Sequence, residues 1–152
     1  MLRLGDNNLE CGAKSVVRAI SQKGNIEELD LSRCNLQETQ EMFEHLKRCH
    51  RLKRLNLSGN QNMQLVALAE TLPSLRMLLA LNLRAVAVPE QAWAVLIDNL
   101  KKCSYLSVQF DGLELSAAKL AASRRERDAA RIGGDAKLAV VWQACHRSHS
   151  AL

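Results

Sequence analysis

Pairs of leucines with one polar residue between them recur along the chain at a nearly constant spacing. The pairs are Leu2-Arg-Leu4, Leu29-Asp-Leu31, Leu55-Asn-Leu57, Leu81-Asn-Leu83 and Leu106-Ser-Val108. Their first members are 27, 26, 26 and 25 residues apart. Alternation of apolar and polar residues over a few positions is the signature of a short strand with one buried face. The pattern therefore predicts five short strands, one in each of about five repeats.

Between these pairs the apolar residues change to a spacing near 3.6, which predicts a helix with one buried face. The predicted buried stripes are Ala13, Val16, Val17 and Ile20 in the first repeat, Met42, Phe43 and Leu46 in the second, Leu65, Leu68 and Leu72 in the third, and Trp93, Leu96, Ile97 and Leu100 in the fourth. Pro73 should shorten the third helix, because proline cannot continue one. A single strand–helix unit cannot bury both its faces, so the units should stack into a parallel sheet backed by helices.

Two further columns are fixed relative to the leucine pairs. Three residues after each pair come Asn7, Cys34, Asn60, Val86 and Asp111, and two further on lie Leu9, Leu36, Asn62, Val88 and Leu113. An asparagine amide at the first column can satisfy backbone groups in the turn after the strand. Val86 cannot do this, and Asn62 stands where an apolar residue is expected, so we expect irregular turns in the third and fourth repeats.

These columns resemble the leucine-rich-repeat pattern Leu-x-x-Leu-x-Leu-x-x-Asn/Cys-x-Leu over residues 1–116. The Asn/Cys alternation at Asn7, Cys34 and Asn60 is similar to that of the ribonuclease-inhibitor-like subfamily, which includes the sensor domains of NOD-like receptors. Cys49, three residues before Leu52, is similar to the cysteine of the repeats in F-box proteins. The resemblance implies an α/β solenoid with parallel strands on the concave face and helices on the convex face. It also implies that Cys34 and Cys49 are structural, buried thiols.

Residues 117–152 depart from the repeat and are predicted to form a C-terminal helical cap. Ser116 can cap a helix that runs to about Ile132, where Gly133-Gly134 would end it. Asp135 can cap a second helix, whose apolar stripe is Leu138, Val141, Trp142 and Cys145. Trp142 then either plugs the last repeat or belongs to an amphipathic helix that faces a partner.

The first repeat has no residues before it that could serve as a cap, because Met1 directly precedes a predicted strand. An uncapped repeat exposes its core to water. Two alternatives remain open at this point: the chain is a fragment of a longer one, or the first repeat docks on a partner, including a second copy of itself.

The composition suits one globular domain, with 152 residues of which 47% are hydrophobic and 24% charged. No apolar run approaches the ~18 residues of a membrane span. Five widely spaced cysteines argue against a secreted disulfide framework, so we expect a cytoplasmic or nuclear location. Only 3% of the residues are aromatic, which argues against a platform for stacking bases.

The net charge of +5 is concentrated near the C-terminus. Residues 1–116 carry 14 basic and 13 acidic residues, whereas residues 117–152 carry seven basic and three acidic ones. The excess centres on Arg124, Arg125, Arg127 and Arg131, which could contact phosphates of a nucleic acid. A second basic cluster at 47–54 is offset locally by Glu38, Glu41 and Glu44. The alternative is that both clusters are solvated helix faces.

We find no pattern that predicts catalysis or a bound cofactor. Cys145, His146 and His149 could be imagined as metal ligands, but structural zinc sites need paired ligands from two chelating segments. No phosphate-binding loop exists, because Gly133-Gly134 lacks the following Lys-Ser/Thr. The sequence therefore predicts a non-enzymatic module.

What remains is a surface for protein partners. Strand alternation turns the residues beside each leucine outward, onto the concave face. The residues predicted to bind a partner there are Glu28, Asp30, Arg54, Asn56, Asn82, Arg84 and Tyr105. Arg54, Arg84 and Tyr105 are the expected anchors, because tyrosine and arginine contribute most at interfaces. We predict a protein–protein interaction module, the C-terminal part of a larger receptor, regulator or scaffold; the alternative is a nucleic-acid-associated protein.

Overall fold

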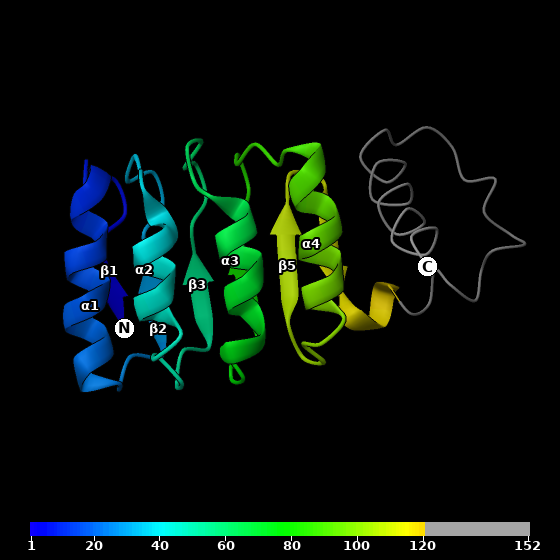
Figure 1. Cartoon of the computed structure of the whole chain (residues 1–152), viewed down its shortest axis with the longest axis horizontal. Coiled ribbons are helices and arrows are strands. Elements are labelled where there is room, and N and C mark those ends of the chain that lie inside the picture. The colour runs from blue at the N-terminus through cyan, green and yellow to red at the C-terminus, as the bar shows by residue number, and fades with distance from the viewer. Residues whose placement is uncertain (121–152) are drawn as a thin grey trace, which may run out of the picture.

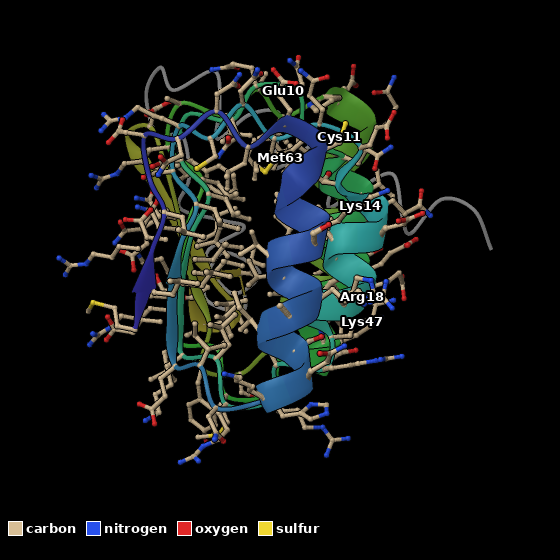
Figure 2. All side chains as sticks on the ribbon, turned by 90° about the vertical axis from the view of Figure 1, so that its left-hand side faces the viewer. Glu10, Cys11, Lys14, Arg18, Lys47 and Met63 are labelled. Atoms are coloured by element: carbon tan, nitrogen blue, oxygen red, sulfur yellow. The ribbon has the colours of Figure 1, made fainter. Side chains whose placement is uncertain are left out.

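The computed structural model describes residues 1–120 of the chain, which form two layers, a sheet and a row of helices along one of its faces (Figures 1 and 2). The strands are β1 (Leu2–Arg3), β2 (Glu28–Asp30), β3 (Arg54–Asn56), β4 (Ala80–Asn82), β5 (Ser107–Phe110) and β6 (Leu113–Ser116). The α-helices are α1 (Ala13–Lys23), α2 (Thr39–Leu46), α3 (Leu65–Thr71) and α4 (Glu90–Leu100), and the 3₁₀ helices are η1 (Glu10–Gly12) and η2 (Leu72–Ser74). This mixed α/β architecture is the expected fold class.

The strands form one sheet in chain order, and β1 to β5 are all parallel. Leu29, Leu55 and Leu81 are direct partners across β2, β3 and β4. A parallel pair requires a crossover connection, and a helical segment supplies it between each strand and the next. The spacing of the leucine pairs in the sequence is therefore the length of one strand together with its crossover.

The core lies between the two layers and contains nearly all the predicted stripes. The residues that are buried as predicted are Ala13, Val17, Met42, Phe43, Leu46, Leu65, Leu68, Leu72, Trp93, Leu96, Ile97 and Leu100. Val16 and Ile20 are only half-buried, because α1 is the end helix of the described row and has a neighbour on one side only. Pro73 lies in η2, directly after α3 ends, so the predicted shortening is confirmed.

The fifth strand corrects one sequence-based prediction. Leu81 pairs with Val108 rather than with Leu106, so the fourth step is 27 residues and β5 runs to Phe110. Leu106 instead lies in the loop before β5, at the position that Leu78 occupies in the loop before β4. Both residues donate their N–H to the carbonyl three residues earlier, Leu78 to Leu75 at 2.9 Å and Leu106 to Cys103 at 3.3 Å. Leu106, Val108 and Phe110 alternate without interruption, so a shift of two residues keeps the same faces buried.

The last strand was not predicted at all. β6 is antiparallel to β5, with Val108 opposite Leu115 and Phe110 opposite Leu113. The turn is Asp111-Gly112, and Gly112 has a φ of 69°, a left-handed conformation that favours glycine. An Asp-Gly pair between alternating apolar residues is a strong hairpin signal, so the sequence did carry this element.

Asn60 is fully buried and occupies the predicted structural column. Its Oδ1 accepts the backbone N–H groups of Cys34 (3.0 Å) and Leu36 (3.2 Å). Its Nδ2 donates to the carbonyls of Leu31 and Leu57, both at 2.9 Å. One amide thus satisfies the turns of two adjacent repeats.

The turn after β4 is satisfied differently, because Val86 stands in this column. The Ala85 N–H donates to Asp111 Oδ2 at 2.9 Å, and Gln61 Nε2 donates to the Ala85 carbonyl at 2.6 Å. Side chains from the two neighbouring repeats therefore replace the missing amide. The other predicted irregularity also has a local solution, since Asn62 is exposed and the adjacent Met63 is buried in its place.

The predicted C-terminal cap lies mostly outside the described residues. Ser116 Oγ accepts the backbone N–H of Lys119 at 3.2 Å, and residues 117–120 are helical. This is the geometry of a helix N-cap. The rest of the predicted cap, including Trp142, lies outside the described residues.

We expect Asn60→Ala to lower the free energy of unfolding by about 3 kcal/mol, because it leaves several buried backbone groups unpaired. Asn62→Ala is the matched control and should change it by less than about 0.5 kcal/mol, since Asn62 is exposed. Urea denaturation of the whole chain measures both. Equal losses for the two variants would contradict the role of Asn60.

Candidate interaction surface

Side chains project from the sheet face that lies away from the helices (Figure 2). The strand register arranges the outward ones in two rows. The first row is Glu28, Arg54, Ala80 and Ser107, and the second is Arg3, Asp30, Asn56, Asn82 and Gln109. Paired residues of parallel strands lie on the same face of a sheet. Side chains 26 or 27 residues apart in the sequence are therefore direct neighbours.

Glu28 and Arg54 form an ion pair across β2 and β3. The Arg54 Nη1 lies 2.5 Å from Glu28 Oε1, and the arginine side chain is 69% exposed. Exposed ion pairs contribute little to stability. The role of this pair is instead to orient Arg54, whose guanidinium stays accessible to a partner.

The polar residue at the end of each central strand makes the same local turn. Asp30 Oδ1 accepts the Ser32 N–H at 2.9 Å, Asn56 Oδ1 accepts the Ser58 N–H at 3.2 Å, and Asn82 Oδ1 accepts the Arg84 N–H at 3.1 Å. A side-chain oxygen that bonds the backbone two residues on is an Asx turn. Three repeats thus fix the orientation of their outward polar side chains in the same way.

Asp30 is held in its charged form at the centre of this surface. Burial raises the pKa of Asp30, but hydrogen bonds from the Ser32 backbone and side chain and from Asn56, with the nearby charge of Arg3, outweigh it. The pKa of Asp30 is therefore below its ordinary value. A partner meets a carboxylate here, not a neutral acid.

The face is hollowed in two places. One hollow, of about 260 Å³, extends from Arg3 on β1 to Gln109 on β5. The other, of about 480 Å³, lies at the carboxyl ends of the first three strands, between Asp30, Arg33 and Ser58. Hollows of this size can receive individual side chains of a partner.

The structure brings together five of the seven residues predicted for this surface: Glu28, Asp30, Arg54, Asn56 and Asn82. Arg84 is exposed in the turn that follows β4. The placement of Tyr105 in the row was wrong, because the shifted register assigns that position to Ser107 and leaves Tyr105 in the loop before β5. Arg124, Arg125, Arg127 and Arg131 lie outside the described residues.

Sequence reasoning missed Glu114 of β6, whose carboxylate accepts a hydrogen bond from Ser107 Oγ and pairs with Lys119 Nζ at 2.9 Å. These two interactions hold the pKa of Glu114 below its ordinary value. The Asp-Gly turn was the signal that could have found it.

The two buried cysteines of the repeats, Cys34 and Cys49, offer no reactive thiol to this surface. Cys34 and Cys49 are fully buried, as predicted, and burial raises the pKa of both thiols. Cys34 Sγ donates to the carbonyl of Leu4 at 3.1 Å, so it takes the structural role that asparagine has in the next repeat. Within residues 1–120 no group of three His, Cys, Asp or Glu side chains is arranged to hold a metal ion. No helix in the same range is long and apolar enough to cross a membrane.

The family model of the leucine-rich repeat matches residues 25–49, which hold β2 and α2. This match supports a leucine-rich-repeat protein. Such repeats generally mediate protein–protein interaction and are generally non-enzymatic. No curated protein and no solved structure matches the chain.

We expect Asp30→Asn to reduce the loss of stability in acid. Because the pKa of Asp30 is lowered in the folded state, its contribution is present at neutral pH and is lost as pH falls through that lowered pKa. The asparagine variant keeps the turn and lacks this titration, so its unfolding free energy should fall less steeply below about pH 5.

Asp30→Ala is the control that removes both the turn and the charge, and it should cost about 1 kcal/mol at neutral pH. Urea denaturation at a series of pH values measures all three proteins. An identical acid dependence for the wild type and Asp30→Asn would contradict the pKa direction.

Proposed function

We propose that this chain is a non-enzymatic interaction module, a leucine-rich-repeat solenoid that binds a protein partner through its concave sheet face. The observation that carries the proposal is the registered row from Asp30 to Gln109, whose members are oriented by the same turn in three consecutive repeats. Binding residues are held by the sheet, so little side-chain entropy is lost when they meet a partner.

The charge distribution on this face suits a protein partner with both polar and charged groups. Arg3 and Arg54 alternate with Glu28 and Asp30 at the β1 side. The outward residues of β4 and β5 are uncharged, and the next charge is Glu114 of β6, which is paired with Lys119. A uniform polyanion such as a nucleic acid would be repelled at the charged end by the carboxylates of Glu28 and Asp30. Complementary patterns of this kind fix the register of a partner and exclude wrong ones.

We further propose that the repeats belong to the ribonuclease-inhibitor-like subfamily and form the C-terminal part of a larger receptor, regulator or scaffold. The period of 26 or 27 residues and the alternation of Cys34 with Asn60 support the subfamily. A role like that of the sensor domains in NOD-like receptors rests on this likeness of fold alone.

Two predictions about other partners stay untested. Nucleic-acid binding rests on arginines beyond residue 120. Self-association through the first repeat finds support in Leu2, Leu4 and Leu9, which are half-buried where Leu29, Leu31 and Leu36 are buried. Solution mass by light scattering at rising protein concentration tests the second of these.

We expect Arg54→Ala combined with Arg84→Ala to weaken binding of a captured protein partner by at least about tenfold, because arginines at the centre of an interface carry much of its energy. Both side chains are exposed, so the melting temperature should stay within about 2 °C of the wild type. Titration of the purified partner measures affinity, and calorimetry measures stability.

The matched control replaces two cations on the outer side of α1, Lys14 and Arg18, by alanine (Figure 2). It removes the same charge and should leave affinity within about twofold. If the α1 variant lost as much affinity as the sheet variant, the concave face would not be the binding surface.

A further inference from the structure

A second surface lies along the edge of the molecule where the chain enters the strands. We call it the strand-entry edge; it consists of the loops at 24–27, 47–53, 75–79 and 101–106. The last three loops share one geometry, because Leu52, Leu78 and Leu106 each donate their N–H to the carbonyl three residues before, at 2.9–3.3 Å. Equivalent positions therefore follow one another along this edge, and residues 51, 77 and 105 form one such set.

Exposed apolar side chains gather at one end of the strand-entry edge. Met77 is 45% exposed, Leu79 50% and Tyr105 83%. They make up three of the five large hydrophobic side chains that are exposed within residues 1–120. Single exposed apolar residues are ordinary, but a cluster on two adjacent loops indicates a binding site.

Of these three residues, Tyr105 lines a pocket of about 300 Å³ between the loops before β4 and β5. Met77 and Leu79 are the chain neighbours of its lining residues Arg76 and Leu78. Its apolar wall includes Leu72, Leu75 and Leu106, and its polar lining includes Arg76, Lys102 and Tyr105. Most of a ligand pocket's contact area is apolar, with a few polar groups that set orientation. This pocket is more polar than that, since polar and apolar atoms line it about equally, and it has the volume of about one large side chain with its flanking backbone.

Cations exceed anions along the whole edge. The acidic residue of the edge is Glu27, whose carboxylate lies 2.9 Å from Lys53 Nζ. Two acidic residues of the adjoining helices are also paired, Glu44 with Lys47 at 2.6 Å and Asp98 with Lys101 at 3.2 Å. Arg48 and Arg76 have no ion-pair partner in the part of the chain that the structure describes. Cations are favoured at helix C-termini, which accounts for part of this bias. That effect does not account for the apolar cluster beside them.

We propose that this pocket binds an acidic peptide segment of a partner protein, with one large apolar side chain inserted beside Tyr105 and flanking carboxylates on Arg76 and Lys102. The pocket favours an inserted side chain over a flat membrane surface. A single exposed aromatic ring does not suit a run of stacked bases. Residues 121–152 of the chain carry six basic and three acidic residues, so their net charge has the same sign as that of the pocket. Charge complementarity therefore favours a segment of a partner protein as the occupant.

The test uses the full chain and a short fluorescein-labelled peptide in which glutamates flank a central Leu-Phe pair. Fluorescence anisotropy at about 0.15 M salt should show saturable binding. Arg76→Glu with Lys102→Glu should weaken it at least about tenfold, and Tyr105→Ala at least about fivefold. The three side chains are exposed or partly so, and circular dichroism should show that the variants stay folded.

Matched controls separate this pocket from the rest of the surface. Lys14→Glu with Arg18→Glu makes the same change of charge on α1, and Arg54→Ala with Arg84→Ala alters the concave face; both should leave affinity within about twofold. A peptide with Gly-Ser in place of Leu-Phe should bind much more weakly. Absence of peptide binding, equal weakening by the α1 control, or tighter binding to anionic vesicles or single-stranded RNA would each overturn the proposal.

Discussion

The constraint on which the structure depends is the pairing of backbone groups in the turn that follows each strand. These turns contain left-handed residues at equivalent positions, Asp6, Arg33, Gly59 and Ala85, and they leave N–H and carbonyl groups inside the molecule. A buried group without a partner costs more free energy than most surface contacts return. Asn60 satisfies this requirement for two repeats at once, and Cys34 and Asp111 satisfy parts of it elsewhere. Because the turns repeat, the strands align, and because the strands align, the outward side chains form rows.

The same register that builds the core also determines which residues a partner can meet. Glu28, Arg54 and Ala80 lie side by side only because the leucines next to them are paired. In the Asx turns at Asp30, Asn56 and Asn82, one side-chain oxygen accepts a backbone N–H. The other polar atom of each side chain stays on the open face. Surface chemistry and core packing are thus two results of one repeat length.

Much of this arrangement could be predicted from the sequence, because leucine alternation and the change to a 3.6-residue spacing report burial directly. The helical stripes at Met42 and Trp93 followed from this pattern, and the buried thiol of Cys34 followed from the resemblance to the leucine-rich repeat. The register of β5 could not be predicted this way, since Leu106, Val108 and Phe110 alternate in either alignment and only pairing with β4 distinguishes them. The position of Tyr105 depended on which of these two alignments β5 takes.

β6 had a local signal in the Asp111-Gly112 turn, which does not belong to the repeated pattern. The pocket at the strand-entry edge had no local sequence signal, because it joins loops about 28 residues apart in the chain.

The antiparallel hairpin at the end of the sheet differs from every other pairing in how much chain it must close. β5 and β6 are joined by Asp111-Gly112 alone, whereas each parallel pair joins residues 26 or 27 apart through a helical crossover. The conformational entropy lost on closing a loop rises with its length, and hairpins of this kind form within about 1–10 μs. The β5–β6 pairing is therefore the one contact of the described sheet that can form before any repeat is complete. It provides a paired edge on which β4 and the strands before it can assemble in turn.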